Sequence, residues 1–179
     1  MKYKIFILIC AIFFVANNIY AQMFHDAAAY ELKGKVKQCQ RDIFGDGDWE
    51  VLNFERNGKL VCSEILQRNS AGYLEISATE DIGYLYTYNN SGMLVEFEII
   101  TRGQSGKFQN FMTSKYIYDS NNRISSELIY QDNKLVGKGT YQYIKIDNKG
   151  NWTERIFNNS SVDGKHNVKV RQKRIITYW

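Results

Sequence analysis

An internal repeat constrains the fold of this chain more than any other feature of its sequence. In each copy an aromatic or aliphatic residue is followed four positions later by glycine or asparagine, and six positions later by an apolar residue. Four copies keep these offsets, and their turn positions are Gly58, Gly92, Asn122 and Gly150. Glycine and asparagine tolerate the positive φ angles of a tight hairpin turn. Each copy therefore predicts a β-hairpin.

The copies in series predict an all-β fold, a meander of repeated β-hairpins that forms an extended or curled antiparallel sheet. A shorter copy covers 130–135, and 69–74 keeps only the turn half. A single hairpin is only marginally stable, so the copies must share one core. We expect this domain to span 31–179, after a leader, 23–30, that is either a short helix or disordered.

The first 22 residues, 1–22, have the three parts of a secretory signal peptide. Lys2 and Lys4 give a positive start, 5–15 is an unbroken apolar run, and Ala21 is a small residue before the expected cut. The run is too short for a transmembrane anchor, which needs about 20 apolar residues. Cys10 lies inside the run, which disfavours a lipoprotein signal. We expect an exported protein of the periplasm or cell surface, or one that is secreted, with no membrane span after cleavage.

The charge of the chain argues against a polyanionic partner. The net charge is +4 at pH 7, and removal of the signal peptide with Lys2 and Lys4 lowers it by two. So small an excess predicts no nucleic-acid partner and no binding to anionic lipid. The basic cluster near the C-terminus is interpreted as the solvated face of a strand, and it consists of Lys169, Arg171, Lys173 and Arg174.

No group of residues has the spacing of a catalytic or metal site. His25 lies in the leader and His166 in a polar loop, and neither has a partner at catalytic spacing. The acidic segment 42–50 lacks the complete ligand spacing of a calcium loop, so an exposed turn is the better interpretation. The sequence predicts no catalytic residue, no metal site and no cofactor.

Two cysteines remain after removal of the signal peptide, Cys39 and Cys62, and both are in strand-like segments. An exported compartment permits a disulfide between them. Two buried thiols are the alternative.

Tyrosines that alternate along the predicted strands are the remaining candidates for a binding site. Under strict alternation the members of each group share one face of a strand. The groups are Tyr84, Tyr86 and Tyr88, then Tyr116 and Tyr118, then Tyr141 and Tyr143. An exposed stripe of tyrosines can stack on sugars or hold a peptide. The alternative is that these tyrosines pack in the core.

The copy Tyr118-Asp119-Ser-Asn-Asn122-Arg123-Ile124 resembles the YD repeats (tyrosine–aspartate repeats) of Rhs-type secreted bacterial proteins, which usually have glycine in place of Asn122. A weaker similarity to MORN-like hairpin repeats runs through 57–60 and 132–141. The segments 30–37 and 147–155 are similar to short exported bacterial proteins of unassigned function. The resemblance implies a β-repeat fold and no particular activity.

These observations predict a non-enzymatic binding or interaction module of the periplasm or cell surface, with a cell-envelope glycan or protein as its partner. One alternative is an enzyme whose site lies on the sheet surface and uses carboxylates such as Glu96, Glu98 and Glu127. Another is an immunity-like or structural partner of a larger secreted protein. An open groove with two facing carboxylates would favour the enzyme, and an aromatic face would favour binding.

Overall fold

The computed structural model describes residues 24–179, and the predicted signal peptide, 1–22, lies outside them. A short 3-10 helix, η1 (Asp26–Tyr30), precedes a 12-stranded antiparallel sheet, which confirms the all-β meander predicted from the repeat. No helix among residues 24–179 is long and apolar enough to cross a membrane. The strands are β1 (Val36–Asp42), β2 (Glu50–Phe54), β3 (Leu60–Val61), β4 (Ile65–Arg68), β5 (Leu74–Ala78), β6 (Ile82–Tyr88), β7 (Leu94–Arg102), β8 (Phe108–Tyr118), β9 (Ile124–Gln131), β10 (Lys134–Ile146), β11 (Trp152–Ser161) and β12 (Asn167–Tyr178).

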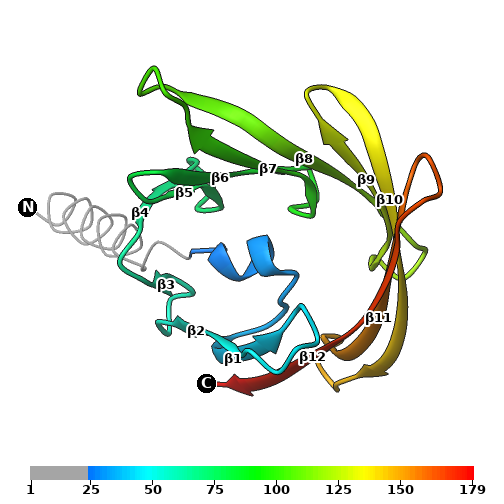
Figure 1. Cartoon of the computed structure of the whole chain (residues 1–179). Coiled ribbons are helices and arrows are strands. Elements are labelled where there is room, and N and C mark those ends of the chain that lie inside the picture. Colours follow the sequence, from blue (N-terminus) through cyan, green and yellow to red (C-terminus); the bar gives the residue numbers. More distant parts are fainter. Residues whose placement is uncertain (1–23) are drawn as a thin grey trace, which may run out of the picture.

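The sheet curls into an open ring around η1 (Figure 1). Its strand order is β3-β2-β1-β12-β11-β10-β9-β8-β7-β6-β5-β4, so most strands pair with their neighbours in sequence. The exception is the pairing of β1 with β12, which places Val36 beside Tyr178. A large twisted sheet tends to curl, and here the ring stays open between β3 and β4, the two edges of the sheet.

The N-terminal segment, 24–35, lies inside the ring and supplies the apolar surface that the inner face of the sheet needs. Ala29 packs with Leu74 in one core cluster. Leu32 packs with Phe54 in the other. A sheet must bury its apolar face against another element, and in this protein that element is the start of its own chain.

Asp26, at the start of η1, joins the two edges of the sheet. Its fully buried carboxylate accepts a hydrogen bond from the backbone N–H of Leu60 in β3 at 2.7 Å. It also accepts a hydrogen bond from Arg68 Nε in β4 at 2.8 Å. The N-terminal segment therefore connects two strands that do not pair with each other.

The turns of the repeat lie at one rim of the ring, because alternate connections of a meander fall at the same end of the sheet. They join β2 to β3, β6 to β7, β8 to β9 and β10 to β11. The φ angles are 90° at Gly58, 74° at Gly92, 56° at Asn122 and 82° at Gly150, the left-handed conformation that the repeat predicts. The shorter copy, 130–135, turns between β9 and β10 at the opposite rim, which explains the irregular spacing of the copies.

The residue after the first apolar position of a copy closes its turn. Asp119 Oδ1 accepts hydrogen bonds from the backbone N–H groups of Asn121 and Arg123 at 2.8 and 2.9 Å. Asn89 and Asp147 make the equivalent pairs of bonds in their own copies. An aspartate or asparagine here satisfies turn N–H groups that would otherwise lack partners. The acidic residue of the motif therefore has a structural role.

Cys39 and Cys62 are both free thiols in this structure, and the topology separates them. Cys39 is buried on β1 opposite Leu52 of β2, whereas the exposed Cys62 follows β3 on the far side of β2. Two strand spacings amount to about 10 Å, and disulfide-bonded Cα atoms lie at most about 7 Å apart. The pairing considered from the sequence is therefore not formed here.

The basic cluster near the C-terminus divides between the two faces of β12. Lys169, Arg171 and Lys173 are exposed. Arg174 is 5% exposed and points into the ring. Successive side chains of a strand point to opposite faces, so the interpretation as one solvated face is wrong for Arg174.

Candidate functional site

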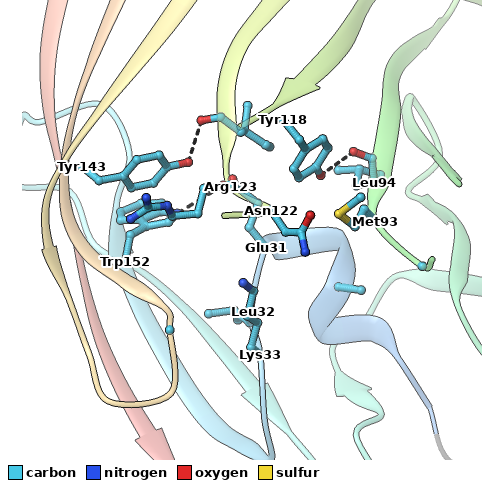
Figure 2. Close-up of a pocket in the computed structure, with 14 residues that line it drawn as sticks. Glu31, Leu32, Lys33, Met93, Leu94, Tyr118, Asn122, Arg123, Tyr143 and Trp152 are labelled. Carbon is cyan, nitrogen blue, oxygen red and sulfur yellow. Dashed lines mark hydrogen bonds between the residues drawn. The ribbon is translucent and has the colours of Figure 1, made fainter. Parts of the chain in front are cut away.

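A pocket opens at the rim that carries the repeat turns, and we call it the rim pocket (Figure 2). Its volume is about 110 Å³. The N-terminal segment forms one wall, and residues at or near the β6–β7, β8–β9 and β10–β11 turns form the rest. Its aromatic and aliphatic lining includes Leu32, Leu94, Tyr118, Ile124, Tyr143 and Trp152.

Two tyrosine rings of the rim pocket have their hydroxyl groups bonded to the protein itself. The Tyr118 hydroxyl donates to the Leu94 carbonyl at 2.7 Å, and the Tyr143 hydroxyl donates to the Ile124 carbonyl at 2.8 Å. Burial raises the pKa of Tyr143 to about 12, so this hydroxyl stays protonated and keeps its bond at neutral pH. The ring faces and the aliphatic side chains remain for a ligand, which favours an apolar group.

Two cationic side chains also belong to the lining of the pocket. The guanidinium carbon of Arg123 lies 5.2 Å from the ring centroid of Tyr143, and Arg123 Nε lies 3.3 Å from an Asp119 oxygen. Lys33 is exposed, and its backbone N–H donates to Asn151 Oδ1 at 2.7 Å. The pocket thus combines apolar surface with two cationic residues and the acidic Glu31.

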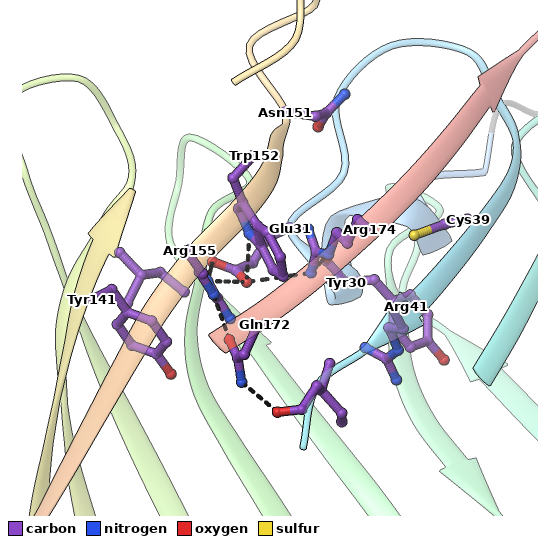
Figure 3. Close-up of polar contacts among 12 residues, drawn as sticks. Tyr30, Glu31, Cys39, Arg41, Tyr141, Asn151, Trp152, Arg155, Gln172 and Arg174 are labelled. Carbon is purple, nitrogen blue, oxygen red and sulfur yellow. Dashed lines mark hydrogen bonds and ion pairs between the residues drawn. The ribbon is translucent and has the colours of Figure 1, made fainter. Parts of the chain in front are cut away.

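Beside the rim pocket, the interior of the ring holds a buried polar group that we call the arginine cluster, formed by Glu31, Arg155, Gln172 and Arg174 (Figure 3). Arg155 Nη1 lies 2.8 Å and Arg174 Nη2 3.5 Å from the same Glu31 oxygen. The guanidinium carbons of the two arginines lie 3.9 and 3.5 Å from the ring centroid of Trp152. Buried charges require partners, and Glu31 serves both arginines.

Burial and neighbouring charge act in opposite directions on these groups. Burial lowers the pKa of Arg174 to about 9, although Glu31 opposes the change. Burial also acts to lower the pKa of Arg155, but Glu31 and Tyr141 raise it above its usual value. Both arginines are therefore charged at neutral pH. Burial raises the pKa of Glu127, which accepts a hydrogen bond from the Tyr141 hydroxyl at 3.0 Å.

The seven candidate tyrosines face the inside of the ring, so the exposed stripe considered from the sequence is corrected. The sheet curls around η1 (Figure 1). Tyr86 is buried in the core cluster that contains Ala29 of η1, and Tyr84, Tyr88 and Tyr116 pack against that cluster. Tyr118 and Tyr143 line the rim pocket. The others lie elsewhere in the ring, and they are Tyr84, Tyr86, Tyr88, Tyr116 and Tyr141.

The three carboxylates considered for an enzyme each have a separate partner. Glu96 pairs with Lys115 at 3.0 Å. Glu98 accepts a hydrogen bond from Asn110 Nδ2 at 2.5 Å. Glu127 is bonded to a tyrosine in the interior, as described above. These contacts do not bring two of the carboxylates face to face.

The histidines and the acidic segment have local roles. His25 and His166 are exposed, and the His25 ring stacks on Tyr73 with centroids 4.6 Å apart. The segment 42–50 is a turn in which Asp42 accepts a hydrogen bond from the Gly45 N–H at 2.6 Å. Among residues 24–179, no three His, Cys, Asp or Glu side chains are grouped as a metal site would require.

Sequence reasoning did not single out Glu31, Arg155, Trp152 or Arg123 as site residues. Trp152 and Arg123 stand inside repeat copies, directly around the turns, and this position was the available signal. Glu31 and Arg155 are 124 residues apart, and no local pattern links them.

Comparison with known proteins finds distant similarity among solved structures. No protein-family model and no curated protein matches this sequence. Among solved structures, the chain is similar to a DUF3836 family protein from Parabacteroides distasonis ATCC 8503. The similarity covers 56% of this chain and 92% of that chain, at 16% identity and a TM-score of 0.38. A likeness that distant does not place this chain in that family.

Proposed function

We propose that this protein is a non-enzymatic binding module of the periplasm or cell surface, and that the rim pocket holds its ligand. The observation that carries the proposal is the surface of the pocket, where the rings of Tyr118, Tyr143 and Trp152 lie beside aliphatic side chains. The polar atoms of these rings are bonded within the protein. Such a surface favours contact with the apolar face of a ligand.

The size of the pocket indicates a small ligand or a protruding part of a larger one. A volume of about 110 Å³ suits a single ring or a short side chain. Sugar rings have an apolar face that stacks on aromatic rings, and an exported protein meets the glycans of the cell envelope. We therefore propose an envelope glycan as the ligand.

The test is a fluorescence titration that uses Trp152 as the reporter. The sequence contains three tryptophans, so replacing Trp49 and Trp179 with phenylalanine leaves Trp152 alone. The probe is a set of soluble muropeptides released from peptidoglycan. We expect a saturable change in Trp152 emission, because Trp152 lines the rim pocket and a ligand there changes the surroundings of its ring.

Two further variants in the same background locate the binding. Tyr143→Leu removes a ring face from the pocket and should weaken binding at least tenfold. Phe111→Leu is the matched control, because Phe111 is 51% exposed on β8 and does not line the pocket. A thermal melt of each variant verifies the fold. Absence of a saturable signal, or equal binding by the Tyr143→Leu variant, would refute the proposal.

A further inference from the structure

The arginine cluster has more hydrogen-bond donors than its single carboxylate can satisfy. The side chains of Arg155 and Arg174 are 7% and 2% exposed. Glu31 lies between them, and one of its oxygens is 2.8 Å from Arg155 Nη1. In the part of the chain that the structure describes, Arg174 Nε and Nη1 are buried and have no hydrogen-bond partner. Buried guanidinium donors without acceptors are rare, so this arrangement favours further acceptor atoms.

Glu31 belongs to the N-terminal segment and not to the sheet that carries the arginines. It caps the C-terminal end of η1 with φ of 56°, a conformation that residues other than glycine rarely adopt. Its backbone N–H donates to the Ala28 carbonyl at 3.1 Å, within the same short helix. Arg155 and Arg174 stand on the paired strands β11 and β12. The arginines are therefore the fixed side of this contact, and the carboxylate is the side on the shorter, less extensively bonded element.

Access to the arginines leads through the rim pocket. Glu31, a member of the arginine cluster, lines that pocket (Figures 2 and 3). Trp152 also lines it, and its ring stacks against Arg155 of the cluster. Trp152 Nε1 donates to a Glu31 oxygen at 3.4 Å. A ligand that enters the pocket with a carboxylate therefore meets Glu31 first, at the point where Glu31 faces the two arginines.

We propose that Arg155 and Arg174 form a carboxylate-binding site that the chain's own Glu31 occupies in this structure, and that a ligand carboxylate competes with Glu31 for it. The N-terminal segment is then an intramolecular ligand, and its seating closes the site. The class of ligand is a carboxylate attached to a small apolar body, with the apolar part against the rings of the rim pocket. The inference rests on the proposed function for the position of that apolar part.

The test is chemical rescue of a variant without the Glu31 carboxylate. Glu31→Gly removes the side chain and suits the positive φ at this position. Propionate has the length of the glutamate side chain, and propionamide is its uncharged match. At ten times its dissociation constant, propionate should raise the Tm of the Glu31→Gly variant by about 3–6 °C. Propionamide in sodium chloride of the same ionic strength should not.

The controls separate a carboxylate site from a general salt effect. The wild type should gain less from propionate than the variant, because Glu31 already occupies the site. The double variant Glu31→Gly, Arg155→Met should not be rescued. Equal shifts with propionate and propionamide, or equal shifts in the wild type and the Glu31→Gly variant, would overturn the inference.

A second measurement applies to the wild type and covers the case in which Glu31→Gly does not fold. Competition predicts faster amide hydrogen exchange at Glu31 and Leu32 in propionate than in propionamide, since their N–H groups bond within the N-terminal segment. If Glu31→Gly does not fold and exchange at Glu31 and Leu32 of the wild type is the same in propionate and propionamide, the inference is overturned. If muropeptides bind the wild type but propionate has neither effect, the proposed function stands and this inference alone fails.

Discussion

Removing the carboxylate of Asp26 should destabilise the protein more than any surface substitution, because Asp26 joins the two edges of the ring. Its carboxylate is 0% exposed. It accepts one hydrogen bond from Leu60 N–H at 2.7 Å and two from Arg68 at 2.8 and 2.5 Å. The hydrogen bond to Asp26, more than any other effect, raises the pKa of Arg68. Loss of Asp26 removes that effect, but an arginine side chain without it is still charged at neutral pH.

The magnitude follows from what Asp26→Ala leaves behind. The variant leaves Arg68, whose side chain is 13% exposed, without its partner, and Leu60 N–H without its acceptor. Breaking a buried ion pair on one side costs about 3–5 kcal/mol. We take about 3 kcal/mol, because Arg68 is partly exposed and water can reach it. For a domain of this size the loss corresponds to a fall in Tm of about 6–12 °C.

The assay is urea and thermal unfolding followed by circular dichroism, with two comparison variants. In Asp163→Ala the lost partners are Lys165 and the Ser161 hydroxyl, and all of these groups lie at an exposed turn, so the change should stay within about 1 kcal/mol. Asp26→Ala, Arg68→Met removes both charges and should be more stable than Asp26→Ala. If Asp26→Ala unfolds within about 0.5 kcal/mol of the wild type, the segment does not hold the edges together.

Two further predictions concern a repeat turn and a buried carboxyl. At Gly150, where φ is 82° and an added Cβ would have Lys33 Cδ as its nearest neighbour at 3.9 Å, thermal melts should show a loss of about 1–2 kcal/mol for valine and much less for asparagine. At Gly92 the substitution by asparagine should lose more stability than at Gly150, because the added Cβ would overlap the Tyr73 hydroxyl oxygen. The repeat alone predicts a small loss for Gly92→Asn, and a small measured loss would contradict the structure. Glu127→Gln should raise the Tm at pH 7, because burial raises the pKa of Glu127 and the stability of the wild type falls as pH rises through that value. The gain should disappear below pH of about 4, where Glu127 is protonated in both states, and a gain that persists there would refute this account.

The hairpins were predictable because their determinants are local. An aspartate or asparagine, a glycine and two apolar residues act within seven positions, and the hydrogen bonds that close the turn stay within the copy. Asp119, for example, bonds to the N–H groups two and four residues later. Sequence alone therefore reveals the meander and the conformation of its turns.

The inside and outside of the ring were not predictable in the same way. Alternation shows that Tyr116 and Tyr118 share a face, but it does not show which face is covered. That depends on the direction in which the sheet curls and on where η1 lies. Arg174 illustrates the limit, because Lys173 and Ile175 on either side of it are exposed while its own guanidinium is buried.

The candidate site depends on the contacts that are most distant in sequence. Hairpins such as β8–β9 join residues a few positions apart, whereas the pairing of β1 with β12 brings Val36 to Tyr178 and Glu31 reaches Arg155 across 124 residues. Closing such long loops costs more entropy than closing a hairpin, so the hairpins should form before the ring does. The N-terminal segment packs on β2 and β5, but its Glu31 has no arginine partner until β11 and β12 have joined the sheet. Both the rim pocket and the arginine cluster therefore need the N-terminal segment and these last two strands together, and their meeting places Glu31 on the arginines.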